Sequence, residues 1–222
     1  MNLLVVIPAF NEERHLPELL HRLQRVIPLD QVLVVDDGSR DRTALLAEAA
    51  GARVLRNPRN QGKGYSLYRG FQYALQEGYD AVLTLDADLQ HPPEYLPAFL
   101  ARAREGYHVV VGSRFHDMRG MPLDRYLTNK TTTLVLSVLT GQRLQDTQSG
   151  YRLIRREVLE RFQPTTFRFD FESELLFQAA LQGFRIGYVP IPTIYGQERS
   201  SIHKVRDTWR FIRLSLKLLA WR

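Results

Sequence analysis

The stretch AVLTLDADLQHPP, residues 81–93, decides the fold that this sequence is expected to adopt. Its first five residues are apolar or β-branched, a run of strand length that predicts a buried β-strand. The run stops at Asp86 and Asp88, two carboxylates one residue apart, and Gln90 follows before a Pro-Pro pair. In open α/β sheets, ligands bind beyond the carboxyl ends of the strands. The oxygen-bearing side chains therefore indicate a site for a hard divalent cation, although an Asp-x-Asp pair alone also fits a surface turn.

Other segments repeat this pattern of an apolar strand followed by polar residues or by a helix. The expected strands cover residues 3–7, 31–35, 52–55 and 109–112, and the expected helices cover 12–27 (capped by Asn11), 42–50, 62–77 and 94–105. This alternation predicts a mostly parallel, twisted α/β sheet flanked by helices, with one ligand-binding edge. No Gly-x-Gly-x-x-Gly follows the first strand, which argues against a dinucleotide site of the NAD type.

The composition is that of a globular protein. Of 222 residues, 44% are hydrophobic and 24% are charged, and 30 basic against 24 acidic residues give a net charge of +6. The absence of cysteine excludes disulfides and thiolate metal sites. We expect no signal peptide and no membrane span, because the N-terminal apolar run is short and no apolar stretch reaches about 20 residues. A modest basic excess suits phosphate-rich ligands or an anionic membrane.

The second half of the chain is less regular. The expected elements are a helix at 121–139, a polar loop at 141–152, a helix at 167–182 and an edge strand at 188–191. In the polar loop, Asp146, Gln148 and Ser149 either contact a ligand or hold the loop together by hydrogen bonds. Both interpretations stay open at this point.

Residues 199–222 form a basic, amphipathic C-terminal tail. On a helix, one narrow stripe bordered by Trp209 and Trp221 would contain Arg206, Arg210, Arg213 and Lys217. Such a stripe is typical of a helix that lies in a membrane interface. The alternative is that its apolar sides pack on the domain or on a second subunit. No nucleic-acid-binding motif accompanies the charge, so nucleic acid is not an expected partner.

Four motifs in a fixed order give the sequence a family resemblance. They are PAFNE at 8–12, DDGS at 36–39, DADLQHP at 86–92 and GSR at 112–114. With them the chain resembles the family 2 glycosyltransferases, and among these the polyprenol-phosphate sugar transferases of the dolichyl-phosphate mannose synthase type. The resemblance implies a GT-A fold, a nucleotide-sugar donor, Mg²⁺ or Mn²⁺, and an inverting transfer. We expect one catalytic domain over residues 1–198, with a Rossmann-like nucleotide-sugar-binding half at 1–114 and an acceptor half at 115–198.

The resemblance also implies roles for individual residues. The positions similar to the family's nucleotide-sugar contacts are Pro8, Phe10, Glu12, Val35, Asp36, Asp37, Asp86, Ala87 and Asp88, of which Asp37 would read the base or the ribose. Asp86, Asp88 and Gln90 resemble the metal ligands. The catalytic candidates are Asp86, Asp88, Arg114 and Arg125, and the two arginines resemble those that hold the acceptor phosphate and the donor diphosphate. The acceptor-side candidates are Asp146, Gln148, Ser149 and Arg199, the last in a different register from the family's arginine.

These roles predict an enzyme that moves a hexose from a GDP- or UDP-sugar to a dolichyl- or undecaprenyl-type phosphate, peripherally at the cytoplasmic face of the membrane. A phosphate acceptor is already largely ionised near neutral pH, because its second pKa is about 6, and it needs positioning more than a general base. One alternative is a saccharide or other hydroxyl acceptor, for which Asp146, Asp170 or Glu172 could supply a base. Another is a catalytically silent nucleotide-sugar-binding membrane adaptor.

Overall fold

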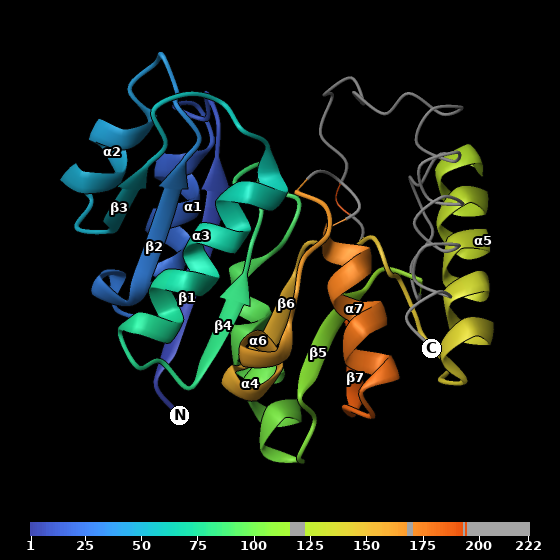
Figure 1. Cartoon of the computed structure of the whole chain (residues 1–222). Coiled ribbons are helices and arrows are strands. Elements are labelled where there is room, and N and C mark those ends of the chain that lie inside the picture. Colours follow the sequence, from blue (N-terminus) through green and yellow to red (C-terminus); the bar gives the residue numbers. More distant parts are fainter. Residues whose placement is uncertain (116–122, 168–170, 193, 195–222) are drawn as a thin grey trace.

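The structure, a computed structural model, describes residues 1–115, 123–167, 171–192 and 194, without the side chains of 123–126 and 128. Within these residues, one seven-stranded sheet has the strand order β3-β2-β1-β4-β6-β5-β7 (Figure 1). The strands are β1 (Leu3–Ala9), β2 (Val32–Asp36), β3 (Arg53–Arg56), β4 (Ala81–Thr84), β5 (Val109–Ser113), β6 (Arg152–Arg155) and β7 (Ile186–Pro190). Strand β7 lies at one edge of the sheet, as the prolines near it predicted.

Most neighbouring strands are parallel, which confirms the expected fold class. The exception is β6, which lies between β4 and β5 and is antiparallel to both. The register places the sequence motifs at one edge of the sheet, because Ala9 pairs with Asp36 and Val6 pairs with Thr84. The PAFNE, DDGS and DADLQHP motifs therefore come from the carboxyl ends of three adjacent strands.

Helices cover both faces of the sheet. They are α1 (Leu16–Leu23), α2 (Thr43–Ala49), α3 (Lys63–Gln76), α4 (Leu96–Arg104), α5 (Leu123–Thr140), α6 (Arg156–Arg161) and α7 (Phe171–Leu181), with 3₁₀ turns at Leu29–Gln31 and Pro93–Tyr95. Alternate residues of a strand point to opposite faces. Val5 and Ile7 therefore pack in the core formed with α1 and α4, while Leu4 and Val6 pack in the core formed with α3 and α7.

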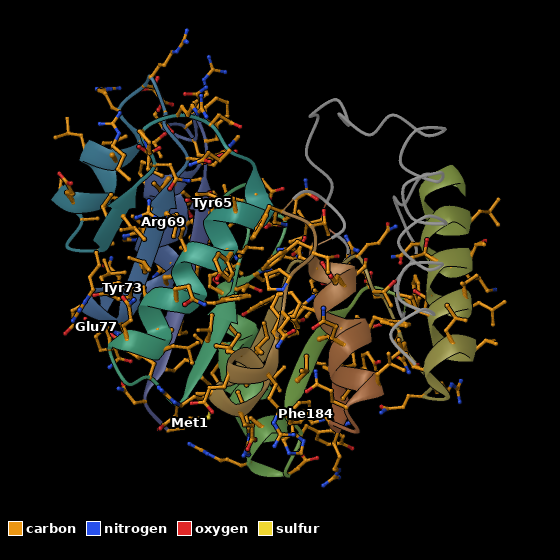
Figure 2. All side chains as sticks on the ribbon, viewed as in Figure 1. Met1, Tyr65, Arg69, Tyr73, Glu77 and Phe184 are labelled. Atoms are coloured by element: carbon orange, nitrogen blue, oxygen red, sulfur yellow. The ribbon has the colours of Figure 1, made fainter. Side chains whose placement is uncertain are left out.

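Helix α3 illustrates how helical periodicity decides which side is buried. Figure 2 shows its outer side, which carries Tyr65, Arg69 and Tyr73 at four-residue intervals, with Glu77 directly after the end of the helix. Leu67, Phe71 and Ala74 are buried on the side that faces the sheet. Gly70 permits the close approach of α3 to β1, because a Cβ atom there would collide with Val6 Cγ1.

Two predictions of local structure were wrong. Asn11 does not cap a helix: α1 begins only at Leu16, and the Asn11 side chain accepts a hydrogen bond from Arg40 N at 3.0 Å. The predicted polar loop at 141–152 ends one residue too late, because Arg152 begins β6, and no element was predicted where β6 continues and α6 follows. The sequence RLIR of β6 is short and has arginine at both ends, so its strand character comes from pairing with β4 and β5 on either side.

None of the helices in the described part of the chain combines the length and the apolar character needed to cross a membrane.

Candidate active site

Asp86 and Asp88 lie close together just beyond β4. Asp86 Oδ1 is 2.6 Å from Lys63 Nζ, and Asp86 Oδ2 is 3.8 Å from His91 Nδ1. Burial is the largest single influence and would raise the pKa of Asp86, but the charge and hydrogen bond of Lys63, together with His91 and Arg114, outweigh it and hold the pKa below its usual range. Burial and the neighbouring charge of Asp86 raise the pKa of Asp88 to about 6. Burial also lowers the pKa of His91 to about 4, so its imidazole is neutral at neutral pH.

Lys63 reaches Asp86 from the first turn of α3. Its Nζ also lies 3.1 Å from Glu172 Oε2, near the start of α7. Burial disfavours the charge of Lys63, but the two carboxylates outweigh burial and raise its pKa, so Lys63 is a cation at neutral pH. One ammonium thus connects the end of β4 with α7.

Asp37, from the DDGS motif, anchors the loop that leads to Lys63. Its carboxylate accepts hydrogen bonds from Asn57 Nδ2, Gln61 N and Gly62 N at 2.6–3.1 Å. Its side chain is buried, with 3% exposure. In this structure, therefore, Asp37 holds the loop at 57–62, and its predicted contact with a base or ribose stays a prediction.

Asp36, its neighbour, stabilises the turn of the motif. Asp36 Oδ1 accepts a hydrogen bond from Ser39 N at 3.0 Å, and Oδ2 lies 2.9 Å from Arg56 Nε. Gly38 has φ +75°, and a Cβ atom there would lie 2.7 Å from backbone atoms of Arg59. A glycine is needed at this position because the loop passes directly over it.

A pocket of about 730 Å³ opens between this turn and the PAFNE motif. Its wall includes Phe10, which is 43% exposed, and its rim includes the exposed arginines Arg40, Arg56 and Arg59. An aromatic ring and guanidinium groups around a polar floor suit a flat, electron-rich ring and its attached phosphates.

The half-buried Arg114 forms an ion pair with the buried Asp146 on the other side of Asp86. Arg114 Nε and Nη2 donate to the two oxygens of Asp146 at 2.8 and 2.7 Å, and Arg114 N donates at 2.9 Å. Asn129 Nδ2, from α5, donates to Asp146 Oδ1 at 2.7 Å. Burial opposes the ionisation of Asp146, but Arg114 and Asn129 outweigh it and hold its pKa below the usual range.

The loop at 146–150 is fixed by a fully buried arginine. Arg152 donates to the carbonyl oxygens of Ser149 and Thr147 at 2.7 and 2.8 Å and to that of Glu172. The loop in turn packs on Asp86, since a Cβ atom at Gly150 would lie 2.5 Å from Asp86 Oδ2. Only a glycine lets the Asp86 carboxylate rest at this position.

Backbone strain is concentrated in the same segments. Among the described residues, three non-glycine residues have left-handed φ values, and they are Asn11 (56°), Leu89 (62°) and Asp146 (45°). Such conformations cost about 1–3 kcal/mol each and persist where the surroundings enforce them. Each of the three lies in a segment that the sequence marked as functional.

The remaining predicted residues are placed as follows. Val35 and Ala87 are buried in the cores, Pro8 and Glu12 are half-buried, Ser149 is buried and Gln148 is exposed. Asp88 Oδ1 accepts a hydrogen bond from Gln90 N at 3.0 Å. The side chain of Arg125, as well as Arg199 and the whole tail at 199–222, lies outside the described residues.

Three residues of the site were not predicted from the sequence. They are Lys63, Asn129 and Arg152. Lys63 had a visible signal, the Gly-Lys-Gly at 62–64 that precedes a helix, but that segment lacks the spacing of a known phosphate loop. Asn129 and Arg152 had none, because their roles arise from contacts between segments far apart in the chain.

The sheet order and the acidic pair that follows its central strand β4 are the layout expected of a GT-A fold. The chain belongs to glycosyl transferase family 2, whose profile matches residues 4–162.

Relatives with assigned names support this membership. The chain is 33% identical over 200 residues to polyprenol monophosphomannose synthase of Mycolicibacterium smegmatis, covering 85% of this chain and 76% of the relative. It is 34% identical over 202 residues to undecaprenyl-phosphate mannosyltransferase of Micrococcus luteus, covering 86% and 83%. A crystal structure of glucosyl-3-phosphoglycerate synthase from Mycobacterium tuberculosis, in complex with Mn²⁺, UDP-glucose and phosphoglyceric acid, shares the fold with a TM-score of 0.75 at 23% identity, covering 98% and 78%.

The expected family, fold and enzyme class are therefore confirmed, and the chain is a glycosyltransferase. The roles of individual residues and the domain boundaries stay predictions.

Proposed function

We propose that this enzyme transfers a hexose from a nucleoside-diphosphate sugar to the phosphate of a polyprenyl phosphate, with inversion and with a divalent cation. It would act from the cytoplasmic face of the membrane. The proposal is supported by the names of two relatives, whose acceptors are a polyprenol phosphate and undecaprenyl phosphate.

The observation that carries the proposal is the position of Arg114 relative to Asp86. Burial acts against the ionisation of Asp86, while the charges of Lys63 and Arg114 both act for it, so the three side chains lie within electrostatic reach. An acidic pair suited to a cation thus adjoins a guanidinium suited to a phosphate. This combination fits a reaction in which both donor and acceptor carry phosphate.

The donor set fits Mg²⁺ or Mn²⁺. Asp86 and Asp88 offer carboxylate oxygens and Gln90 an amide oxygen, the ligand types that these hard cations take. Two adjacent, half-buried acids repel each other, and this repulsion adds to partial burial in raising the pKa of Asp88; a cation would relieve it. When bound, the cation would stabilise the negative charge that develops on the departing nucleoside diphosphate. Within the described residues, no group of three or more His, Asp or Glu side chains forms a metal cluster.

The chain's own residues would then do the positioning. Arg114 would hold the acceptor phosphate, and Asp146 and Asn129 would fix the orientation of its guanidinium. The pocket beside Phe10 would take the nucleoside, and Lys63 would add positive charge beside the donor phosphates. A dianionic phosphate acceptor needs no general base in this scheme.

The test is a transfer assay with the purified full chain. GDP-mannose or UDP-glucose is mixed with undecaprenyl phosphate in detergent and with Mn²⁺ or Mg²⁺, and the glycosyl phosphoryl polyprenol is measured by mass spectrometry. We expect a product whose formation stops when EDTA is added. Saccharide and phosphoglycerate acceptors run in parallel. Transfer to a hydroxyl acceptor alone, or donor binding without turnover, would overturn the proposal.

A further inference from the structure

Helix α5 exposes more apolar surface than an ordinary surface helix, although its Leu136 is buried and packs in the core. Its buried positions include the polar residues Asn129, Thr132 and Thr133, which are 3–6% exposed. Its exposed positions include large apolar residues, namely Leu127 (53%), Leu134 (64%), Val135 (36%) and Val138 (73%). A helix that packs on a core normally shows the opposite distribution.

The exposed apolar residues lie along one side of the helix in a stripe that we call the outer face of α5, and the exposed polar residues Lys130 and Thr131 lie between Leu127 and the other three. Leu127, Leu134 and Val138 are separated by seven and four residues, so they lie above one another along the helix, and Val135 adjoins them. The stripe runs for about 16 Å, at 1.5 Å per residue. Figure 1 shows α5 at the opposite end of the molecule from α2, and Figure 2 shows side chains of α5 that project away from the sheet.

Hydrogen bonds fix the helix in this orientation. Asn129 donates to Asp146 at 2.7 Å, Thr133 Oγ1 lies 3.1 Å from Thr147 Oγ1, and Ser137 Oγ accepts from Leu144 N at 3.0 Å. Turning the outer face inward would break all three contacts and leave buried polar groups unpaired, which is unfavourable. These hydrogen bonds therefore fix the apolar stripe on the outside of the fold.

The charges around the stripe indicate what it contacts. Helix α5 and the segment that follows it to residue 145 contain three basic residues, Arg125, Lys130 and Arg143, and one acidic residue, Asp124. Lys130 and Arg143 are exposed. An apolar stripe flanked by positive charge complements an anionic lipid surface, in which acyl chains take the apolar side chains and phosphates take the basic ones.

We propose that the outer face of α5 lies in the boundary between headgroups and acyl chains of an anionic phospholipid bilayer. This rests on the proposed function, because a polyprenyl phosphate acceptor is itself held in that bilayer. The opposite face of the same helix carries Asn129, which contacts Asp146 and through it Arg114. One helix would thus separate the bilayer from the arginine that receives the acceptor phosphate, and it would set the height of the site above the membrane.

The first test measures partitioning of the full chain onto vesicles of phosphatidylcholine with and without phosphatidylglycerol. The double variant Leu134→Glu/Val138→Glu is compared with wild type and with Leu45→Glu. Leu45 is a matched control, because it is 61% exposed but lies on α2. We expect the double variant to bind anionic vesicles at least about tenfold more weakly, since two apolar contacts become charged, and Leu45→Glu to bind like wild type. Equal binding by all three would overturn the proposal.

A second measurement does not depend on these variants. The chain has no cysteine, so Val138→Cys and Leu45→Cys can each carry a single environment-sensitive fluorophore. With anionic vesicles the probe at 138 should shift to the blue and become accessible to brominated lipid, while the probe at 45 should not. A probe at 138 already blue-shifted without lipid would overturn the proposal: loss of that shift on dilution would assign the face to a second copy, and loss on deleting 195–222 to the tail.

The same preparations separate this inference from the function on which it rests. Transfer is measured with a short, water-soluble prenyl phosphate as well as with undecaprenyl phosphate in vesicles. Activity on the soluble acceptor without vesicle binding would refute the membrane role of α5 and leave the proposed function standing. Vesicle binding through α5 without transfer to either acceptor would refute the proposed function alone.

Discussion

Helices α1 and α5 differ in which side chains they bury and which they expose. Helix α1 buries four leucines (Leu16, Leu19, Leu20 and Leu23) and turns its polar side to solvent. Helix α5 buries Asn129, Thr132 and Thr133 together with Leu136, and it exposes Leu127, Leu134, Val135 and Val138. The first helix is held by apolar burial, and the second is held largely by side-chain hydrogen bonds around Asp146. The donor side of the enzyme thus rests on a conventional core, while the acceptor side rests on a polar network that leaves apolar groups outside.

The largest effect on stability should come from breaking that polar network. Arg114→Met would leave Asp146 as a buried carboxylate without its guanidinium, and removing one partner of a buried pair costs about 3–5 kcal/mol. Urea denaturation measures the loss. The control is Arg42→Met, which breaks the exposed pair with Glu13 and should change stability little, because such pairs contribute little. A similar small change in both variants would mean that the network does not support the acceptor side.

The next prediction tests whether apolar burial stabilises the donor side. Leu20→Ala removes a side chain that is 1% exposed in α1, so a cavity should form and the free energy of unfolding should fall by about 2–5 kcal/mol. Leu45→Ala, at an exposed position of α2, serves as the control and should stay within about 0.5 kcal/mol of wild type. Equal losses at the two positions would contradict the burial described for α1.

The third prediction concerns the acidic pair, where the donor side meets the acceptor side. Asp88→Ala removes a proposed cation ligand, so transfer should fall at least about 100-fold, about 2.7 kcal/mol in the barrier. Binding of the free nucleoside should change little, because the pocket beside Phe10 lies elsewhere on the edge. Steady-state kinetics and calorimetry measure the two quantities, with Asp30→Ala, an exposed position, as control. Unchanged turnover in Asp88→Ala would remove this residue from the mechanism.

A pH dependence should distinguish α5 from α1. The folded-state pKa of Asp146 lies below its usual value, which is about 3.9 in the unfolded chain. Its contribution to stability is therefore complete above that value and is lost as pH falls through the folded-state pKa, because the unfolded state then binds the proton more readily. Arg114 contacts this carboxylate, and Arg152 and His91 lie within electrostatic reach of it.

Hydrogen exchange after brief incubation at acid pH checks this. Amides of α5 should lose protection before those of α1. In Asp146→Asn, the protection of α5 amides should be the same after mild acid as after strong acid. Simultaneous opening of both helices would mean that the network is not the acid-sensitive element.

The difference between the donor side and the acceptor side also explains how much of the structure could be predicted from the sequence. On the donor side, apolar runs such as Leu3–Ile7 end in polar motifs, so the strands and the sheet edge that carries these motifs were predicted correctly. On the acceptor side, Arg152 is the first residue of β6 and is buried because it donates to three carbonyl oxygens brought together by the fold. A charged residue in a four-residue strand carries no periodic signal, and long-range contacts of this kind leave no local pattern.

The smallest effect is expected on the outer face of α5. Leucine and glutamine have similar helix propensities, so Leu134→Gln tests exposure and little else. Leu134 is 64% exposed, and in dilute solution without lipid the free energy of unfolding should change by less than about 0.5 kcal/mol. Thermal and urea denaturation provide the measurement, with Leu136→Gln as the matched position two residues away. Leu136 is 1% exposed, so its replacement should cost several times more, because a polar amide would be buried without a partner. Leu134→Gln could instead lower the free energy of unfolding as much as Leu136→Gln. Another part of the protein would then already cover the stripe without lipid, and α5 would be held by apolar burial as α1 is.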